Sequence, residues 1–194
     1  MSEQGKFIVL YGANNLGKST QVRFLVQRLE QEGVPAKLLK YPIYDLEPTG
    51  PQINAVLRKG VAMTDEGLQD LFARNRRDFE PILKEVLGRG IWVVAEDYTG
   101  TGVSWGVTHN IPLATMEEIN KGLLKEDLAI LLDGERFSAG IEREHRHEAG
   151  SDWEKARQVH LELASRYGWE VVNANQTMER VSGAIWEIVR KQVL

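Results

Sequence analysis

Hydrophobic residues gather in five short runs along the chain, and longer segments that mix polar and apolar residues separate them. The runs cover residues 7–11, 36–41, 91–95, 128–132 and 169–172. Short apolar runs of this kind are typical of strands that are buried on both faces, as in parallel sheets. The pattern therefore predicts an α/β fold in three layers, with a five-stranded parallel sheet between two layers of helices.

Several segments between the runs repeat their apolar residues every three or four positions, which predicts helices with one buried face. Helices are predicted over residues 20–29, 52–58 and 151–167. Thr64 is expected to cap a long helix, and Pro81 within that segment predicts a bend or a restart. Further helix starts are predicted at Thr115 and Ser151, which open capping boxes, and at Thr177.

A glycine-rich turn joins the first predicted strand to the first predicted helix. It reads Gly12-Ala13-Asn14-Asn15-Leu16-Gly17-Lys18-Ser19-Thr20 and fits the phosphate-binding loop pattern of Gly, four free positions and Gly-Lys-Ser. In that pattern the backbone N–H groups and the helix N-terminus surround phosphates, the lysine reaches the β- and γ-phosphates, and the serine hydroxyl contacts Mg²⁺. The sequence therefore predicts that residues 12–20 bind a nucleoside triphosphate, against the alternative of a chance glycine-rich turn.

Two acids, Glu96 and Asp97, directly follow the third predicted strand. Because the carboxyl ends of parallel strands lie at one edge of a sheet, these acids are expected near the phosphate-binding loop. P-loop enzymes hold Mg²⁺ with an acid at such a strand end, so Glu96 is a candidate metal ligand together with Ser19. The alternative is that these carboxylates only cap a helix on a solvated loop.

The segment of residues 135–150 carries many charges and few apolar residues. It is predicted to be a lid that brings arginines, Arg143 and Arg146 among them, onto the transferring phosphoryl group. The alternative is an ordinary charged surface loop. The two histidines of this segment lack a third ligand at metal-binding spacing, so no zinc site is predicted there.

Phe72 and Arg76 lie four positions apart in the long predicted helix and therefore share a face. A ring beside a planar cation can stack on a nucleobase and bond its edge, although a phenylalanine on a helix is more often a core residue.

Composition narrows the function classes. A length of 194 residues fits a single domain spanning residues 1–194, and the net charge of −4 argues against a nucleic-acid partner. The absence of cysteine excludes a disulfide framework and a thiol nucleophile, and it fits a cytoplasmic protein. No apolar run approaches the length of about 20 residues that a membrane span needs, and no signal peptide is evident.

Taken together, these motifs resemble the thymidylate kinase family of P-loop nucleoside monophosphate kinases, and the resemblance extends over nearly the whole chain. The Phe72–Arg76 helix is the most family-specific part, since the phosphate-binding loop occurs in many families. The other matching segments are Gly12–Gln21, Tyr41-Pro42, Pro48-Thr49-Gly50, Tyr98, Gly102-Val103, Leu131-Leu132-Asp133 and the last strand and helix.

The resemblance implies a homodimeric enzyme that transfers the γ-phosphoryl group of ATP to dTMP with Mg²⁺ as cofactor. It implies that Lys18 holds the ATP phosphates, that Phe72 stacks on thymine and that Arg76 bonds the polar edge of the base. It further implies that Tyr98 rejects a ribose 2′-hydroxyl. Asp97 and Gly102 complete the expected acceptor site, and Asn173 and Asn175 fall where the family binds adenine.

The sequence departs from the family pattern in three segments. Asn14 and Asn15 stand in the phosphate-binding loop where members usually have an acid, and Asp97 replaces an arginine that would contact phosphate. No arginine is evident around Tyr44 and Asp45, so Arg143 and Arg146 are expected to compensate from the lid. The departures leave two alternatives open: a deoxynucleoside kinase in which Asp97 or Glu96 is a general base, and a non-catalytic nucleotide-binding paralogue.

Overall fold

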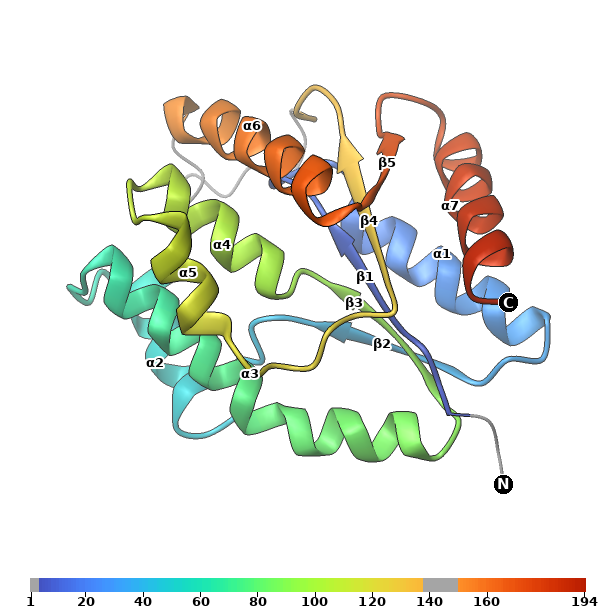
Figure 1. Cartoon of the computed structure of the whole chain (residues 1–194), viewed down its shortest axis with the longest axis horizontal. Coiled ribbons are helices and arrows are strands. Elements are labelled where there is room, and N and C mark those ends of the chain that lie inside the picture. The colour runs from blue at the N-terminus through green and yellow to red at the C-terminus, as the bar shows by residue number, and fades with distance from the viewer. Residues whose placement is uncertain (1–3, 138–149) are drawn as a thin grey trace.

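The computed structural model describes residues 4–137 and 150–194, and its centre is a parallel sheet with the strand order β2-β3-β1-β4-β5 (Figure 1). The strands are β1 (Phe7–Tyr11), β2 (Ala36–Lys40), β3 (Trp92–Glu96), β4 (Leu128–Asp133) and β5 (Glu170–Asn173). All residues of β1 and β3 are buried, because each of these strands has a neighbour on both sides and helices over both faces. The predicted five-stranded parallel sheet is therefore confirmed.

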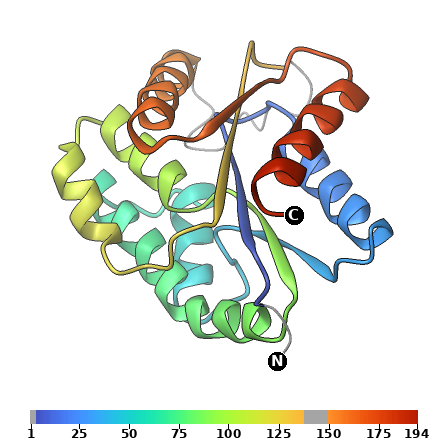
Figure 2. The same cartoon turned by 45° about the vertical axis from the view of Figure 1, so that its right-hand side comes forward.

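Helices cover both faces of the sheet, as Figure 2 shows from the side. On one face lie α1 (Lys18–Gln31) and α7 (Met178–Gln192), and Ile8 and Leu10 of β1 point into this layer. On the other face lie α3 (Asp65–Gly88) and α6 (Gly150–Tyr167), where Phe7 and Val9 contribute to a second core. The alternation along β1 thus fills one core on each side of the sheet.

The remaining helices extend the second layer. They are α2 (Thr49–Arg58), α4 (Thr99–Thr108) and α5 (Leu113–Asn120). No helix in the described part of the chain is long and apolar enough to cross a membrane.

The predicted helix caps have mixed outcomes. Thr64 accepts a hydrogen bond from the Gly67 N–H at 3.1 Å, and Thr177 accepts one from the Arg180 N–H at 3.4 Å, so both starts are confirmed. The capping box at Thr115 is wrong, because α5 already begins at Leu113 behind Pro112. The helix α6 begins at Gly150, one residue before the predicted start at Ser151.

Two further differences concern α3 and α4. The helix α3 continues through Pro81 to Gly88, so no restart occurs, because Leu83 and Leu87 beyond the proline pack into the sheet core. No helix was predicted over residues 99–108, since three glycines lower the helix propensity of this segment. These glycines let α4 approach its neighbours closely, and that packing outweighs the propensity.

Candidate functional site

A cavity of about 480 Å³ opens at the edge of the sheet where the strands end. Its wall includes residues of the loop after β1, the end of β2, the helices α2 and α3, and the β3–α4 junction. The size lies within the range of small-molecule sites, and the location at the carboxyl ends of parallel strands is where such folds bind ligands.

The loop after β1 adopts the backbone shape that its glycines permit. Gly12 and Gly17 have φ angles of 144° and 83°, which side chains strongly disfavour. At Gly12 a Cβ atom would also lie 2.6 Å from the Leu132 carbonyl oxygen, so the loop can pass this close to β4 only with glycine. Gly17 is the N-cap residue of α1, so the helix begins directly at the end of the loop.

Lys18 lies at the centre of this loop and is 5% exposed. Its Nζ donates hydrogen bonds to the carbonyl oxygens of Gly12 at 2.8 Å and Ala13 at 3.0 Å. The cavity wall also contains Asn14, Asn15, Gly17, Ser19 and Thr20. The loop therefore contributes an ammonium group and the serine residue Ser19 to the lining of the cavity.

Two carboxylates face this loop from the end of β3. Glu96 is buried and pairs with the Lys40 Nζ at 3.0 Å. The Asp97 carboxylate lies 3.6 Å from the Lys18 Nζ and accepts a hydrogen bond from the Thr101 hydroxyl at 2.8 Å. Burial raises the pKa of Asp97, and the charge of Glu96 adds to this effect, while Lys18 opposes it.

Phe72 and Arg76 of α3 also line the cavity. Arg76 is 5% exposed, and its Nη1 donates to the Asn120 Oδ1 at 3.1 Å. Burial lowers the pKa of Arg76, and in the described part of the chain no carboxylate forms an ion pair with it. A buried guanidinium with this environment favours a polar ligand that accepts hydrogen bonds.

Gly102 in α4 lines the cavity as well and lies beside Arg76. A Cβ atom at Gly102 would lie 2.9 Å from the Arg76 Nη2, so only glycine allows the guanidinium to take this position. The cavity thus brings together most of the residues predicted for the phosphate, metal and acceptor sites.

Several other predicted site residues lie outside this cavity. Tyr98 is fully buried between the rings of Phe7 and Tyr41, and Gly12, Ala13 and Leu16 contribute to the loop without lining the cavity. The lid arginines Arg143 and Arg146 lie outside the described residues.

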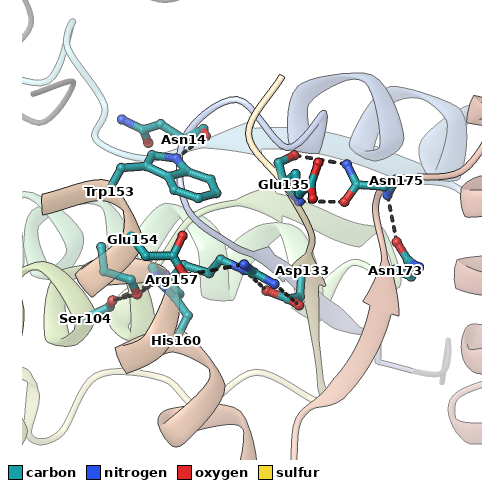
Figure 3. Close-up of polar contacts among 11 residues, drawn as sticks. Asn14, Ser104, Asp133, Glu135, Trp153, Glu154, Arg157, His160, Asn173 and Asn175 are labelled. Atoms are coloured by element: carbon teal, nitrogen blue, oxygen red, sulfur yellow. Dashed lines mark hydrogen bonds and ion pairs between the residues drawn. The ribbon is translucent and has the colours of Figure 1, made fainter. Parts of the chain in front are cut away.

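Asn173 and Asn175 line a separate hollow at the end of β5 (Figure 3). The Asn175 Nδ2 donates to the Glu135 carbonyl at 3.0 Å, and the Asn175 N–H donates to the Asn173 Oδ1 at 2.8 Å. Below them in this view, Arg157 of α6 forms two hydrogen bonds with Asp133 of β4. The Asn175–Glu135 contact holds the loops after β4 and β5 together, and the Arg157–Asp133 pair joins α6 to the end of β4.

The sequence did not single out several residues of the cavity wall. Lys40, Gln69 and Trp105 are the clearest examples. The sequence could have indicated two of them. Lys40 ends a strand at the edge of the sheet where ligands are predicted to bind, and Gln69 lies one helical turn before Phe72 on the same face. No sequence feature indicated Trp105, because the helix α4 was not predicted.

The oxygen ligands around the loop suit Mg²⁺. Ser19 and Glu96 both line the cavity, and hydroxyl and carboxylate oxygens are the ligands that this cation prefers. Among the described residues no group of three or more His, Cys, Asp or Glu side chains could hold a metal ion. The donor set therefore fits a cation that shares its coordination with water and substrate phosphates.

A parallel sheet whose first strand leads through such a loop into a helix, with a carboxylate at the end of the next strand, defines a P-loop nucleotide-binding protein. Comparison with known proteins narrows this class. The family model described as thymidylate kinase matches residues 10–185. The chain belongs to the thymidylate kinase family.

Individual relatives agree with the family model. The thymidylate kinase of Homo sapiens is 32% identical over 186 residues, which cover 93% of this chain and 87% of that protein. The thymidylate kinase of Dictyostelium discoideum is 30% identical over 192 residues, covering 97% and 86%. A solved structure of the Candida albicans thymidylate kinase superposes with a TM-score of 0.84 at 25% identity, covering 98% of this chain and 93% of that one.

Proposed function

We propose that this protein transfers the γ-phosphoryl group of ATP to dTMP and forms ADP and dTDP. The observation that carries the proposal is a single cavity lined both by Lys18, from the phosphate-binding loop pattern, and by Phe72 and Arg76. A nucleoside triphosphate placed at the loop and a nucleoside monophosphate placed at the Phe72–Arg76 pair would meet with their phosphates between them.

The chemistry needs positioning and charge neutralisation more than proton transfer. A phosphate monoester is already anionic at neutral pH, so its oxygen can attack without a general base. Lys18 and the N–H groups at the start of α1 are assigned to the ATP phosphates, where they stabilise the negative charge of the transition state. The Lys18 ammonium now bonds carbonyl oxygens, and phosphate oxygens would replace these contacts.

Asp97 stands where a cation would serve an acceptor phosphate, yet the cavity remains favourable for anions. Among its described lining residues, the cations Lys18, Lys40, Arg58 and Arg76 outnumber the carboxylates Glu96 and Asp97. Lys40 also reaches Glu96 at the centre of the site, so a cation stands beside the two acids. This balance supports a substrate pair that carries several negative charges.

The proposal includes Mg²⁺, which Ser19 and Glu96 would hold together with substrate oxygens. When bound, the cation neutralises phosphate charge and makes the terminal phosphorus easier to attack. The Glu96 carboxylate is held in place by Lys40 and can therefore accept a cation or its water without leaving the wall of the cavity. The adenine position at Asn173 and Asn175, the lid of residues 135–150, the homodimer and the cytoplasmic location are further parts of this proposal.

The test is ADP production from ATP and Mg²⁺ with a panel of acceptors: dTMP, dUMP, dCMP, UMP, dGMP and thymidine. We expect turnover with dTMP well above the others. Turnover with thymidine alone would instead support a deoxynucleoside kinase, and ATP binding without any turnover would support a non-catalytic protein. As a control, Lys18→Met should abolish turnover, whereas Lys37→Met on the exposed side of β2 should not.

A further inference from the structure

Gln69 is a polar residue of the cavity for which the proposed function has not yet given a role. It lies in α3, three residues before Phe72 and seven before Arg76, so the three side chains share one face of the helix. All three line the cavity, and Gln69 is only 1% exposed. Its amide is therefore buried in the wall of the cavity that Phe72 also lines.

Neither the Oε1 nor the Nε2 atom of Gln69 has a hydrogen-bond partner in the part of the chain that the structure describes. Buried amide groups are nearly always paired, because an unmet donor or acceptor loses its bonds to water without replacement. An amide with both ends unpaired and facing a ligand cavity points to a bound molecule that supplies the missing partners.

Arg76 limits which molecule fits. The Gln69 Oε1 and the Arg76 guanidinium approach the same point of α4: a Cβ atom at Gly102 would lie 3.3 Å from the former and 2.9 Å from the Arg76 Nη2. A guanidinium only donates hydrogen bonds, whereas an amide both accepts and donates. A ligand that pairs both side chains therefore presents an acceptor to Arg76 and, next to it, a donor to the Gln69 carbonyl or an acceptor to the Gln69 amino group.

We infer that Gln69 is a specificity-determining residue that reads the imide edge of a 2,4-dioxopyrimidine, the base class of thymine and uracil. This inference rests on the proposed function, since it places the acceptor base on Phe72. The base N3–H donates to the Gln69 Oε1, the Arg76 guanidinium donates to the O4 carbonyl, and the Gln69 Nε2 donates to a remaining carbonyl oxygen of the base.

Cytosine does not fit this arrangement. Cytosine has an amino group in place of O4, so this amino group and the Arg76 guanidinium, both hydrogen-bond donors, would face each other. The N3 atom of cytosine also carries no hydrogen that the Gln69 carbonyl could accept. Rotation of the Gln69 amide could satisfy cytosine by itself, but it leaves the conflict at Arg76. Arg76 therefore rejects cytosine, and Gln69 completes the match to the dioxopyrimidine by pairing with its N3–H.

The experiment combines a variant with a modified ligand. Gln69→Met keeps the length of the side chain and removes both polar ends, and dTMP methylated at N3 cannot donate from that position. Isothermal titration calorimetry gives the dissociation constants of both ligands for both proteins. We expect the wild type to bind dTMP about 10- to 100-fold more tightly than N3-methyl-dTMP, and Gln69→Met to lose most of that preference by binding dTMP more weakly.

Two controls separate this role from a structural one. Gln69→Met should melt at the same temperature as the wild type or higher, because it removes two unpaired buried atoms, and its affinity for ATP should not change. Gln27→Met, at an exposed position of α1, should leave all values as they are.

Unchanged preference against the N3-methyl ligand in Gln69→Met overturns the inference while the proposed function stands. A clear loss of melting temperature with equal loss of affinity for ATP also overturns it, because Gln69 would then be structural. Failure of the wild type to bind or phosphorylate dTMP overturns the proposed function, and the inference with it.

Discussion

At the scale of single residues, Asp97 lies in an environment that disfavours its charged form. Its carboxylate is 17% exposed and lies 3.6 Å from Lys18, and Glu96 adds a second negative charge nearby. Burial disfavours the charged form of an acid more than one opposite charge restores it, which is why the pKa of Asp97 is raised. A charged carboxylate beside the phosphate-binding loop therefore lowers the free energy of unfolding at neutral pH.

Asp97→Asn should therefore stabilise the protein at neutral pH. A raised pKa means that the folded state binds a proton more readily than the unfolded state, so stability falls as the pH rises through that pKa. We expect the variant to melt at a higher temperature than the wild type at pH 7. The difference should shrink as the pH falls toward the ordinary aspartate pKa of about 3.9.

Thermal melts of both proteins from pH 7 downward measure this effect. Asp70→Asn, at an exposed position of α3, is the matched control and should show little difference at any pH. Equal melting temperatures of Asp97→Asn and the wild type at pH 7 would show that Lys18 fully compensates the buried charge.

At the scale of elements, α4 shows how small residues allow the close packing that stabilises a helix. Glycines at positions 100, 102 and 106 face Trp169, Arg76 and Met116, and a Cβ atom at any of them would come within 3.0 Å of the neighbour. Propensity alone disfavours a helix here, but the close packing against α3, α5 and α6 stabilises it. Since Thr101 and Gly102 of α4 line the cavity, this packing also positions part of the site.

Gly100→Ala should destabilise the protein by about 1–3 kcal/mol, because the new methyl group would lie 2.4 Å from the rigid Trp169 ring. Gly183→Ala in α7 is the matched control, since nothing lies within 4 Å of its Cβ position. There the same change should stabilise the helix by about 0.5–1 kcal/mol. Urea unfolding of both variants tests the pair, and equal effects would contradict the close packing of α4.

The contact between α6 and α4 contains a buried histidine. The His160 Nδ1 lies 2.8 Å from both the Ser104 Oγ and the Ala156 carbonyl oxygen, and burial lowers the pKa of His160 to about 4. The unfolded state therefore binds more protons than the folded state between this pKa and the ordinary value of 6.5. Stability should fall by about 3 kcal/mol from this group as the pH decreases through that interval.

His160→Gln should remove this pH-dependent loss, because its amide does not titrate. Ser104→Ala keeps the imidazole and should retain the loss. The free energy of unfolding in urea at several pH values between 7 and 4 distinguishes the two variants. An unchanged pH dependence in His160→Gln would show that other groups dominate acid unfolding.

At the scale of the whole molecule, the sheet assembles one cavity from distant segments. The phosphate-binding loop follows β1, the carboxylates follow β3, and the Phe72 ring comes from α3 on one face of the sheet. Because the phosphate-binding loop and the Phe72 ring belong to different elements, binding at each of them should respond separately to substitution.

Phe72→Ala should therefore weaken dTMP binding by about 10- to 100-fold, as expected for the loss of stacking on one base. ATP affinity should stay near the wild-type value, since the ring does not belong to the phosphate-binding loop. Calorimetric titration of each nucleotide measures the two effects. Equal loss for both nucleotides would indicate that Phe72 supports the fold instead of the base.

The sequence by itself determined the sheet, the phosphate-binding loop and the residues Lys18, Glu96, Phe72 and Arg76 that line the cavity. These features are local: apolar runs encode strands, glycines encode the loop, and helical spacing places Phe72 beside Arg76. The convergence of strand ends then follows from the general behaviour of parallel sheets.

Only the tertiary structure decided the strand order, the helix α4, the burial of Tyr98, the position of Gln69 and the ion pair of Asp97 with Lys18. Each depends on partners far away in the sequence: Trp169 packs against Gly100, Phe7 covers Tyr98, and Lys18 faces Asp97. Local propensity carries no information about such partners, because close packing and desolvation arise only when the layers meet.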